Sequence, residues 1–580
     1  MAPMVLTGST FGSDWGSHLW LIQMQADNIV HLGHPSLFFQ SGLGGFEPWY
    51  AFYGGTLYSL VAAAAVLSGG HTLATYILSW ALTMAMVFGG FTWIARQCGL
   101  GGWVAYASGF FFLTSAYFLT DVYARGAWAE TVATSSIPLV AAGGLALLRA
   151  DSWRVGPVLA FVFAVVIFSG SHNITLLYGC MFLLVLSVAA AAAIGRRRLP
   201  PLRRMLTLAA LALVAVGVNL WFLLPNIAYG GKTTIGHSFT SPPKITGEIP
   251  LGILLDPVRR QVAGITGSTT FDLQLPTLAL AWSLITLALC WQTLAPVWRR
   301  LAVAVFFTGL LFLAPILFPG IWHAVPRILW SIQFPYRLLT YVDFCVVALV
   351  MIAVIALLKQ RRTALTAALV LASVLIAVFE TGQAMVQEWG TPSFLSSRSE
   401  IFPGGGRVPS LWARVVTYHQ YQDDSLPVVS ASIGEIPGAT QNNGEGENVI
   451  SVRAEEEIKS SYTVTFTPPE SGTVNTNILT GPYLVGVKGA KIVGRSPNQY
   501  MVIAVKKQPD GRPTRVTFGT AGTWPIVLGR WATYLSLLAL AALLVLLTRR
   551  QLRARAASRP SQPQGRARSS PASAPPPTTS

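Results

Sequence analysis

Charged residues are scarce in this chain: only 11% of its 580 residues are Asp, Glu, Lys or Arg, while 52% are hydrophobic. A soluble globular domain carries about 25% charged residues, so the composition excludes an ordinary soluble enzyme. Cysteine is rare too, and its four residues lie in or beside apolar runs, which excludes a disulfide scaffold. The sequence has no CxxC pair, no zinc-spaced Cys/His cluster and no P-loop or dinucleotide-binding glycine motif. It therefore predicts a polytopic membrane protein without a cytoplasmic nucleotide site.

Eleven apolar runs are long enough to cross a bilayer, which takes roughly 17 to 25 helical residues. They lie at 73–95, 103–119, 130–148, 155–170, 174–194, 205–224, 276–294, 301–318, 340–357, 364–380 and 526–547. Between alternate runs stand basic clusters at Arg96, Arg149 with Arg154, Arg196–Arg198 with Arg203 and Arg204, Arg299 with Arg300, Lys359 with Arg361 and Arg362, and from Arg549 onward. The positive-inside rule assigns these clusters to the cytoplasm. The net charge of +17 is thus a signal of topology rather than of nucleic-acid binding.

Acidic residues follow the opposite pattern. Of the 23 Asp and Glu residues, only Asp151 falls on the side of the basic clusters, and all eight histidines fall on the other side. Side chains that handle protons are therefore expected on the extracytoplasmic face of the cell membrane. No targeting peptide is evident, and the first spans would serve for insertion.

The apolar run 49–67 contains Gly54 followed by a second glycine and begins with Trp and Tyr. Counting it as a span would move Asp14 to the cytoplasmic side, away from the loop of Asp121, Arg125 and Glu130. We therefore expect a re-entrant or interfacial helix within a long first outer loop. On that topology either the chain starts on the outer side, or a span that precedes Asp14 is missing from this start.

The composition changes over 381–525. Alternating segments such as Tyr462–Phe466, Tyr483–Val487 and Tyr500–Val505, separated by turn residues, predict half-buried antiparallel strands. We expect an extracytoplasmic β-sandwich at 381–525, between a transmembrane domain at 1–380 and a final span at 526–548. Residues 549–580 are rich in Arg and then in Ser, Pro and Ala, which predicts a disordered cytoplasmic tail.

Three aromatic residues of this domain, Trp412, Tyr418 and His419, are candidates for stacking on a sugar. Positions in an aromatic core are the commoner explanation for them. The charged runs of the domain are typical of solvated faces, so we expect the domain to guide an acceptor and to contribute no catalytic group.

Asp14 and His18 stand four residues apart at the start of an apolar, helical pattern. A helix would place the carboxylate and the imidazole on one face, where they form a candidate general-base site. Asp14 is also a favoured residue for an N-cap, and the two roles are compatible.

A second constellation joins Asp121, Arg125 and Glu130 between two spans. An arginine can hold a phosphate by two parallel hydrogen bonds while acids orient it or a metal. An internal ion pair between Arg125 and Glu130 explains the pattern equally well. His172, between two other spans, supports the same cavity or has a structural role.

Arg327 and Arg337 lie among aromatic residues in a third outer loop. An interfacial arginine is costly unless it is paired, so it marks a candidate site, and an anionic lipid headgroup is its natural partner. Interfacial anchoring is the alternative.

The segments Tyr123–Glu130 and Gln333–Arg337, the early Asp14 and an aromatic-rich helix after it resemble the bacterial membrane family labelled 6-pyruvoyl-tetrahydropterin-synthase-related. That family is similar to the GT-C integral membrane glycosyltransferases, and the resemblance covers roughly residues 10–345. It implies an appended outer β-domain and a first-loop acid that acts as base or metal ligand, which maps onto Asp14.

The resemblance maps a second outer-loop acid onto Asp121 or Glu130. The chain departs from the pattern because no span precedes Asp14 and the DxD-like or WWD-type signatures of some GT-C branches are absent. The pterin label finds no support, since no zinc-binding histidine triad is present.

Together these observations predict a glycosyltransferase that moves a sugar from a polyprenyl-phosphate-linked donor to an extracytoplasmic glycan or lipid acceptor. Nucleotide sugars are absent outside the cell, so a lipid must deliver the activated sugar. Asp14, Glu130 and Asp121 are the catalytic candidates; Arg125, Arg337 and Arg327 are the phosphate-binding candidates; His18 and His172 are supporting residues. The need for a divalent cation stays open. A transporter or flippase of lipid-linked sugars and a noncatalytic scaffold for envelope assembly are the alternatives.

Overall fold

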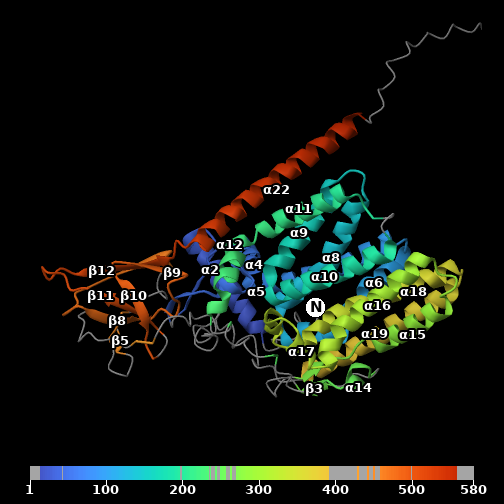
Figure 1. Cartoon of the computed structure of the whole chain (residues 1–580), viewed down its shortest axis with the longest axis horizontal. Coiled ribbons are helices and arrows are strands. Elements are labelled where there is room, and N and C mark those ends of the chain that lie inside the picture. Colours follow the sequence, from blue (N-terminus) through green and yellow to red (C-terminus); the bar gives the residue numbers. More distant parts are fainter. Residues whose placement is uncertain are drawn as a thin grey trace, which may run out of the picture.

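A computed structural model describes residues 14–41, 44–195, 199–233, 236, 242–243, 249–256, 261–263, 270–390, 428–429, 441–442, 448–450, 458–497 and 500–557. A helical bundle makes up most of this part, and small β-sheets lie beyond one end of it (Figure 1). The aromatic candidates Trp412, Tyr418 and His419 lie outside the described residues.

The main helices follow the predicted apolar runs. Their bounds are α2 Trp15–Leu32, α3 Trp49–Phe52, α4 Gly55–Leu67, α5 Thr72–Gln97, α6 Gly102–Leu113, α7 Ala116–Leu119, η1 Thr120–Arg125, α8 Trp128–Arg149, α9 Val155–Ser171, α10 Asn173–Ile194, α11 Leu202–Gly217, α12 Leu220–Tyr229, η3 Gly230–Lys232, α14 Leu251–Leu254, α15 Thr277–Leu289, α16 Pro296–Leu317, α17 Ile321–Ala324, η4 Arg327–Ile332, η5 Pro335–Leu338, α18 Leu339–Lys359, α19 Thr363–Gly390 and α22 Trp524–Ala557.

Within the described part of the chain, six helices are long and apolar enough to cross a membrane: α5, α8, α10, α16, α18 with η5, and α22. Two bent pairs, α6 with α7 and η1 (58°) and α11 with α12 and η3 (82°), raise this number to eight if each pair is one span. The remaining predicted spans form the shorter apolar helices α9, α15 and the first part of α19. The chain thus has the helices of a membrane protein, but the predicted count of eleven spans is not confirmed.

The apolar run 49–67 is two helices, α3 and α4, separated at Gly54, whose φ is 59°. A Cβ at Gly54 would lie 2.4 Å from the carbonyl oxygen of Ser171, so glycine is needed for backbone conformation and for space. The side-chain amides of Asn173 and Asn226 donate to the carbonyl oxygen of Phe52 at 2.6 and 3.1 Å. The predicted break is present, and two side-chain amides satisfy the carbonyl group of Phe52 beside it.

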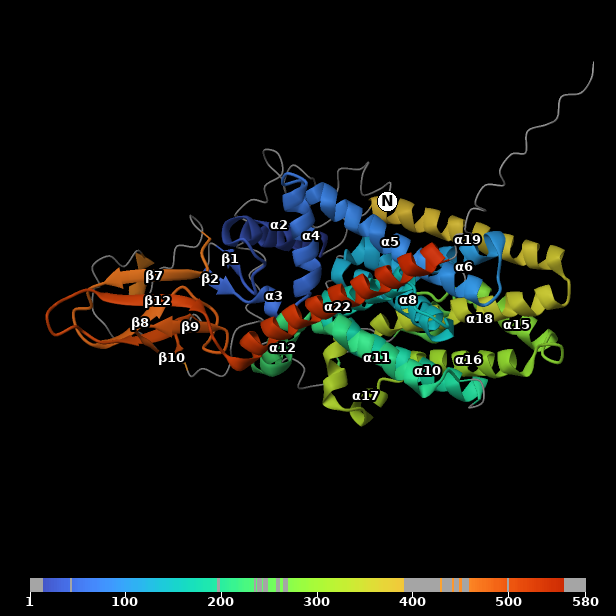
Figure 2. The ribbon, with the colours of Figure 1, turned by 90° about the horizontal axis from the view of Figure 1, so that it is seen from above.

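A second break separates α11 from α12. Thr533 of α22 lies against it: its hydroxyl is 3.3 and 3.2 Å from the carbonyl oxygens of Gly217 and Val218 and accepts from the N–H of Trp221 at 3.0 Å. Figure 2 shows α22 lying over α12 and α11, with which it is in contact. One hydroxyl of α22 therefore forms hydrogen bonds with backbone groups on both sides of the bend.

The sheets near the C-terminus have the strand orders β10-β11-β8-β6-β5 and β7-β12-β9. Their strands are β5 Gln441–Asn442, β6 Asn448–Ile450, β7 Ser461–Phe466, β8 Gly472–Thr476, β9 Val485–Lys488, β10 Lys491–Arg495, β11 Met501–Val505 and β12 Thr514–Thr520. All pairs except β6 with β8 are antiparallel. The three strands predicted from alternation are present as β7, β9 and β11. A sandwich over 381–525 is not confirmed, because α19 continues to Gly390 and most of 391–457 lies outside the described residues.

A short hairpin connects the sheets to the bundle. It consists of β1 (Phe39–Ser41) and β2 (Gly44–Glu47), and a second hairpin of the bundle pairs β3 (Gln261–Ala263) with β4 (Thr270–Asp272). The hydroxyl of Thr480 donates to the carbonyl oxygen of Phe46 at 2.7 Å, and the ring of Phe46 packs edge-on against Tyr462. The neighbouring Glu47 is buried, and burial raises its pKa to about 8.

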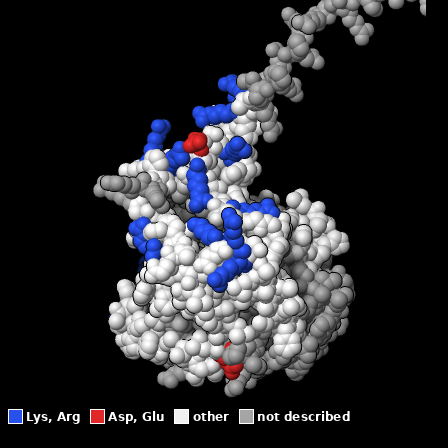
Figure 3. Space-filling view, turned by 90° about the vertical axis from the view of Figure 1, so that its right-hand side faces the viewer, with Lys and Arg blue, Asp and Glu red and all other residues white. Residues whose placement is uncertain are grey.

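The end of the molecule opposite the sheets is rich in Lys and Arg, with few acidic residues in view (Figure 3). Arg149 donates to the last carbonyl of α5, at Gln97, at 2.7 Å. Arg204 pairs with Asp151 at 3.2 Å. Cations near helix C-termini interact favourably with the helix dipole, so part of this basic end stabilises the helices that terminate there.

Candidate functional site

Arg125 lies in a buried network of ionic contacts. It ends η1, a π-helical turn, and forms ion pairs with Asp121 of the same turn and with Glu130 at 3.1 Å. The sequence pattern predicted a loop at the membrane surface, but the three side chains are each no more than 5% exposed. The segment is helical because it continues the bent helix α6–α7, and π-helical turns are frequent at functional sites.

Glu130 connects the two arginines of the site. Its Oε2 atom lies 3.1 Å from Nη2 of Arg125 and 3.1 Å from Nε of Arg337, and its Oε1 accepts from the hydroxyl of Tyr117 at 3.1 Å. Glu130 also lies in the first turn of α8, where the helix dipole favours a negative charge. The internal Arg125–Glu130 ion pair considered from the sequence is therefore present, and it extends to Arg337. We call Asp121, Arg125, Glu130 and Arg337 the ion-pair cluster.

Arg337 is held by a strained turn. Gln333 has φ 61° and ψ −52°, and the N–H of Phe334 donates to the carbonyl oxygen of Ile332 at 2.7 Å, which together define a γ-turn with positive φ. Nη1 of Arg337 donates to that same carbonyl oxygen at 3.1 Å and to Oε1 of Gln333 at 3.2 Å. Such backbone strain costs roughly 1–3 kcal/mol and is concentrated at functional sites.

Two aromatic rings of the same segment lie between the arginines. The rings of Phe334 and Tyr336 stack within 3° of parallel, with centroids 5.4 Å apart. Arg337 lies over Phe334 at 5.1 Å, and Arg125 lies over Tyr336 at 5.8 Å. These cation–π contacts fix the orientation of both guanidinium groups.

Asp14 is adjacent to this cluster. Its backbone N–H donates to the carbonyl oxygen of Arg125 at 2.9 Å. Asp14 occupies the N-cap position of α2, as one interpretation predicted, yet its side chain makes no capping hydrogen bond. This hydrogen bond places the half-buried residue Asp14 next to the backbone of Arg125, whose guanidinium group binds Asp121 and Glu130.

His18 lies among aromatic rings rather than on the carboxylate of Asp14. Its Nδ1 is 2.5 Å from the hydroxyl of Tyr58, and its ring is stacked with Tyr53 and edge-on to Trp128. Burial, together with the charges of His172 and Arg125, lowers the pKa of His18 to about 3. A neutral imidazole at this place supports the site and carries no positive charge at neutral pH.

His172 has the structural role that the sequence left open. It is the N-cap of α10, and its Nδ1 accepts from the N–H of Thr175 at 3.3 Å and lies 2.7 Å from the hydroxyl of that threonine. Its ring is also edge-on to Tyr53, with centroids 5.2 Å apart.

Tyr53 is a residue of the site that the sequence analysis did not single out. Its half-buried ring lies between His18 and His172. Burial raises the pKa of its phenol, Asp14 and Glu130 raise it further, and the positive charge of Arg337 opposes them. An aromatic residue in an apolar run carries no signal of its own, but the glycine pair that follows Tyr53 marks the break that exposes it.

Of the predicted phosphate-binding residues, Arg125 and Arg337 come together and Arg327 does not join them. Arg327 is exposed and lies over the ring of Trp330 at 5.7 Å, as expected of an interfacial anchor.

The ion-pair cluster contains two guanidinium groups and two carboxyl groups, so its charges balance. The arginines can hold a phosphate or pyrophosphate, and the half-buried carboxylate of Asp14 can take a proton from a hydroxyl group beside them. In the described part of the chain, no group of three or more His, Cys, Asp or Glu side chains is arranged to hold a metal ion.

Comparisons of the chain with protein-family models, with curated proteins and with solved structures find no match.

Proposed function

We propose that this protein is a GT-C-like membrane glycosyltransferase. It transfers a sugar from a polyprenyl-phosphate-linked donor to a glycan or lipid acceptor of the cell envelope. The observation that supports this best is the convergence of Arg125 and Arg337, which come from separate parts of the chain, on Glu130, with the backbone of Asp14 hydrogen-bonded to that of Arg125. Two arginines match the phosphate of such a donor, because each offers a planar fork of N–H groups.

The proposed step is a direct displacement. A hydroxyl oxygen of the acceptor attacks the anomeric carbon and forms the new glycosidic bond, while its proton passes to the carboxylate of Asp14. The bond between the anomeric carbon and the lipid phosphate breaks, and the phosphate oxygen keeps the electron pair. Arg337 and Arg125 then stabilise the charge on that leaving oxygen.

The balanced charge of the ion-pair cluster sets a condition for donor binding. Arg337 is 11% exposed, against 5% for Arg125, so it is the arginine that an incoming phosphate reaches first. Because Oε2 of Glu130 lies 3.1 Å from Nε of Arg337, the phosphate must compete with Glu130 for this guanidinium group. In this proposal Glu130 and Asp121 tune the arginines, while Asp14 is the base. A divalent cation would assist by sharing the charge of the phosphate.

The same proposal assigns sides of the plasma membrane. The basic end faces the cytoplasm under the positive-inside rule, and the site and the C-terminal sheets face the extracytoplasmic side. We propose that the shorter helices α9, α15 and α19 complete a set of eleven spans together with the long ones. The sheets would then belong to an outer β-sandwich that guides the acceptor.

The test is sugar transfer by the purified full-length protein in liposomes, with a series of radiolabelled polyprenyl-phosphate sugars as donors and envelope glycans as acceptors. Asp14→Asn keeps the shape of the side chain and removes the base, so transfer should fall about 10²- to 10⁴-fold while donor binding stays intact. Movement of labelled lipid across the bilayer without transfer would identify a flippase instead. The absence of both sugar transfer and lipid movement, with every donor tested, would favour a scaffold.

A further inference from the structure

Tyr53 stands at the break between α3 and α4, in an extended conformation with φ −147° and ψ 103°. Its N–H donates to the carbonyl oxygen of Trp49 at 2.9 Å, and the preceding carbonyl group, that of Phe52, accepts hydrogen bonds from two side-chain amides. A side chain at Gly54, which follows, would collide with the backbone of α9. Contacts therefore fix the backbone on both sides of Tyr53, so its position is set before a ligand binds.

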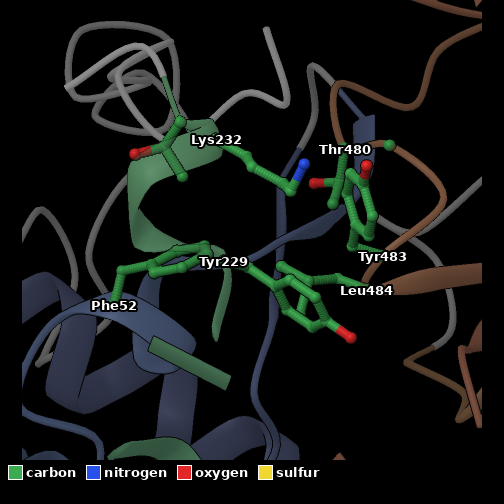
Figure 4. Close-up of a pocket in the computed structure, with 8 residues that line it drawn as sticks. Phe52, Tyr229, Lys232, Thr480, Tyr483 and Leu484 are labelled. Atoms are coloured by element: carbon green, nitrogen blue, oxygen red, sulfur yellow. The ribbon is translucent and has the colours of Figure 1, made fainter. Parts of the chain in front are cut away.

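The neighbouring residues Phe52 and Tyr53 have different surroundings. Phe52 lines a hollow between the bundle and the sheet region (Figure 4). This hollow encloses about 10 Å³, room for about one water, and the rings of Tyr229 and Tyr483 in its wall pack 5.0 Å apart. Phe52 thus anchors the end of α3 by packing, whereas the ring of Tyr53 contacts both histidines of the candidate site.

Aromatic rings pack around that of Tyr53. The distances between ring centroids are 5.2 Å to His172, 5.7 Å to Trp49, 6.2 Å to His18 and 6.3 Å to Tyr58. Tyr53 is nevertheless half-buried, so part of the side chain is open to a ligand. The packing holds the ring in place while the residue stays accessible.

The hydroxyl group of Tyr53 differs from those of other tyrosines in the bundle. Tyr50, Tyr58, Tyr117 and Tyr341 each form a hydrogen bond through the hydroxyl group within the protein. No hydrogen bond among the described residues involves the hydroxyl of Tyr53. A hydroxyl group with a fixed ring and no protein partner is free to bind a ligand.

The charged side chains of the candidate site act on this phenol. Burial raises the pKa of Tyr53, the negative charges of Asp14 and Glu130 raise it further, and the positive charges of Arg337 and Arg125 oppose them. The phenol therefore keeps its proton at neutral pH and can donate a hydrogen bond. It is within electrostatic reach of both the proposed base and the arginine that a phosphate reaches first. In the proposed displacement, the oxygen that links the anomeric carbon to phosphorus lies between these two groups.

We propose that the hydroxyl group of Tyr53 is a catalytic group, which donates a hydrogen bond to the phosphate of the donor at the oxygen that leaves the anomeric carbon. The inference rests on the proposed transferase function and adds a residue to its mechanism. As the glycosyl bond breaks, this oxygen keeps the electron pair and gains negative charge, so the hydrogen bond strengthens in the transition state. Tyr53 keeps its own proton, and the proton of the acceptor passes to Asp14.

The experiment first measures binding of undecaprenyl phosphate, without a sugar, to the purified full-length protein by native mass spectrometry. This lipid exposes the leaving oxygen, so it reports the hydrogen bond even in a protein that transfers no sugar. Tyr53→Phe keeps the ring and should weaken binding about 10- to 100-fold, the loss expected for a hydrogen bond to a charged group. With a sugar-bearing donor, the same variant should lower kcat more than it changes KM.

Tyr50→Phe is the matched control. It removes another hydroxyl group of α3, which donates to the carbonyl oxygen of Leu21 at 2.6 Å. This variant should lower the unfolding temperature and leave binding of undecaprenyl phosphate unchanged. Tyr53→Phe should do the reverse, because its hydroxyl group has no partner to lose among the described residues. A purely structural role of Tyr53 would not produce this contrast.

The outcomes separate the role of Tyr53 from the proposed function. Weaker binding by Tyr53→Phe, in a protein whose wild type transfers no sugar, would support the phosphate contact and contradict the transferase. Equal binding of undecaprenyl phosphate by Tyr53→Phe and the wild type would overturn the role of Tyr53, whether or not sugar is transferred. An equal loss of binding in Tyr50→Phe would overturn it too. A wild type that does not bind this lipid would overturn both proposals.

Discussion

Nε of Arg337 lies 3.1 Å from Oε2 of Glu130, the same oxygen that receives Nη2 of Arg125 at 3.1 Å. One carboxylate oxygen thus joins two guanidinium groups that are far apart in the sequence. This arrangement makes Glu130 a competitor for any anion that binds the arginines. The first prediction follows from this competition.

Arg337→Ala should weaken binding of a polyprenyl-phosphate sugar about 10- to 100-fold, because it removes hydrogen bonds to a charged phosphate. Arg337→Lys should recover only part of the loss, since lysine cannot form two parallel hydrogen bonds. Titration of the donor followed by native mass spectrometry measures both. As the matched control, Glu130→Gln removes the competitor and should tighten donor binding. An unchanged affinity for the donor in all three variants would refute the assignment of a phosphate site.

Arg125→Ala should destabilise the protein more than Arg337→Ala does. Arg125 lies between two buried carboxyl groups, and removing one partner of a buried ion pair costs about 3–5 kcal/mol. The double variant Arg125→Met, Asp121→Asn leaves Glu130 paired with Arg337, removes the stranded charge of Asp121 and should recover most of the stability. Thermal unfolding at a fixed scan rate in one detergent compares the variants. A loss for Arg125→Ala no greater than that for Arg337→Ala would contradict this reading of the contacts.

Glu47 predicts a dependence of stability on pH. Burial raises its pKa from 4.5 to about 8 in the folded protein, so the folded state binds a proton that the unfolded state releases. The free energy of unfolding is therefore unaffected by Glu47 below about pH 4.5, falls as the pH rises and reaches its minimum above pH 8. Glu47→Gln should therefore raise the unfolding temperature increasingly from pH 5 to pH 8, by an amount that corresponds to a few kcal/mol at most. A difference in unfolding temperature between variant and wild type that stays constant over this range would show that the pKa of Glu47 is not raised in the folded protein.

The proposed topology predicts which positions a membrane-impermeant thiol reagent reaches in intact cells. In a cysteine-free background, cysteine at His71, before α5, and at Lys507, in the sheet region, should both be labelled from outside. Cysteine at Ser152, at the basic end, should be labelled only after permeabilisation. All three side chains are exposed, so access depends on the side of the membrane. Labelling of Ser152→Cys in intact cells would reverse the assignment.

The sequence predicted which residue types meet at the candidate site, while their side of the membrane stays a prediction. Charge asymmetry grouped Asp14, Arg125, Glu130 and Arg337 on one face, and contacts of the structure join them. The pairing itself could not be predicted, because the Glu130–Arg337 contact depends on how distant helices pack. The strained turn at Gln333 was also invisible, since a glutamine carries no preference for positive φ.

The helical fold was predictable where apolar length alone decides it. Gly54 predicted the break between α3 and α4, because glycine is the residue that most readily adopts a positive φ. The bend between α11 and α12 had no such mark, since the groups that satisfy it belong to Thr533 in a remote helix. The sheet strands were found by alternation, but α19 extends to Gly390, past the expected boundary and beyond its apolar part, which ends at Phe379.

The contact of Thr533 with the α11–α12 bend has a consequence for the time course of synthesis. Thr533 follows Gly217 by 316 residues, so the ribosome completes the bend long before it makes the hydroxyl that satisfies it. At about 5–20 residues per second, this delay is roughly 15–60 s. During that interval the backbone groups at the bend lack the hydroxyl of Thr533, so water or an insertion factor must form hydrogen bonds with them. Arrival of α22 displaces that temporary partner, and maturation of the bundle is then tied to the synthesis of α22.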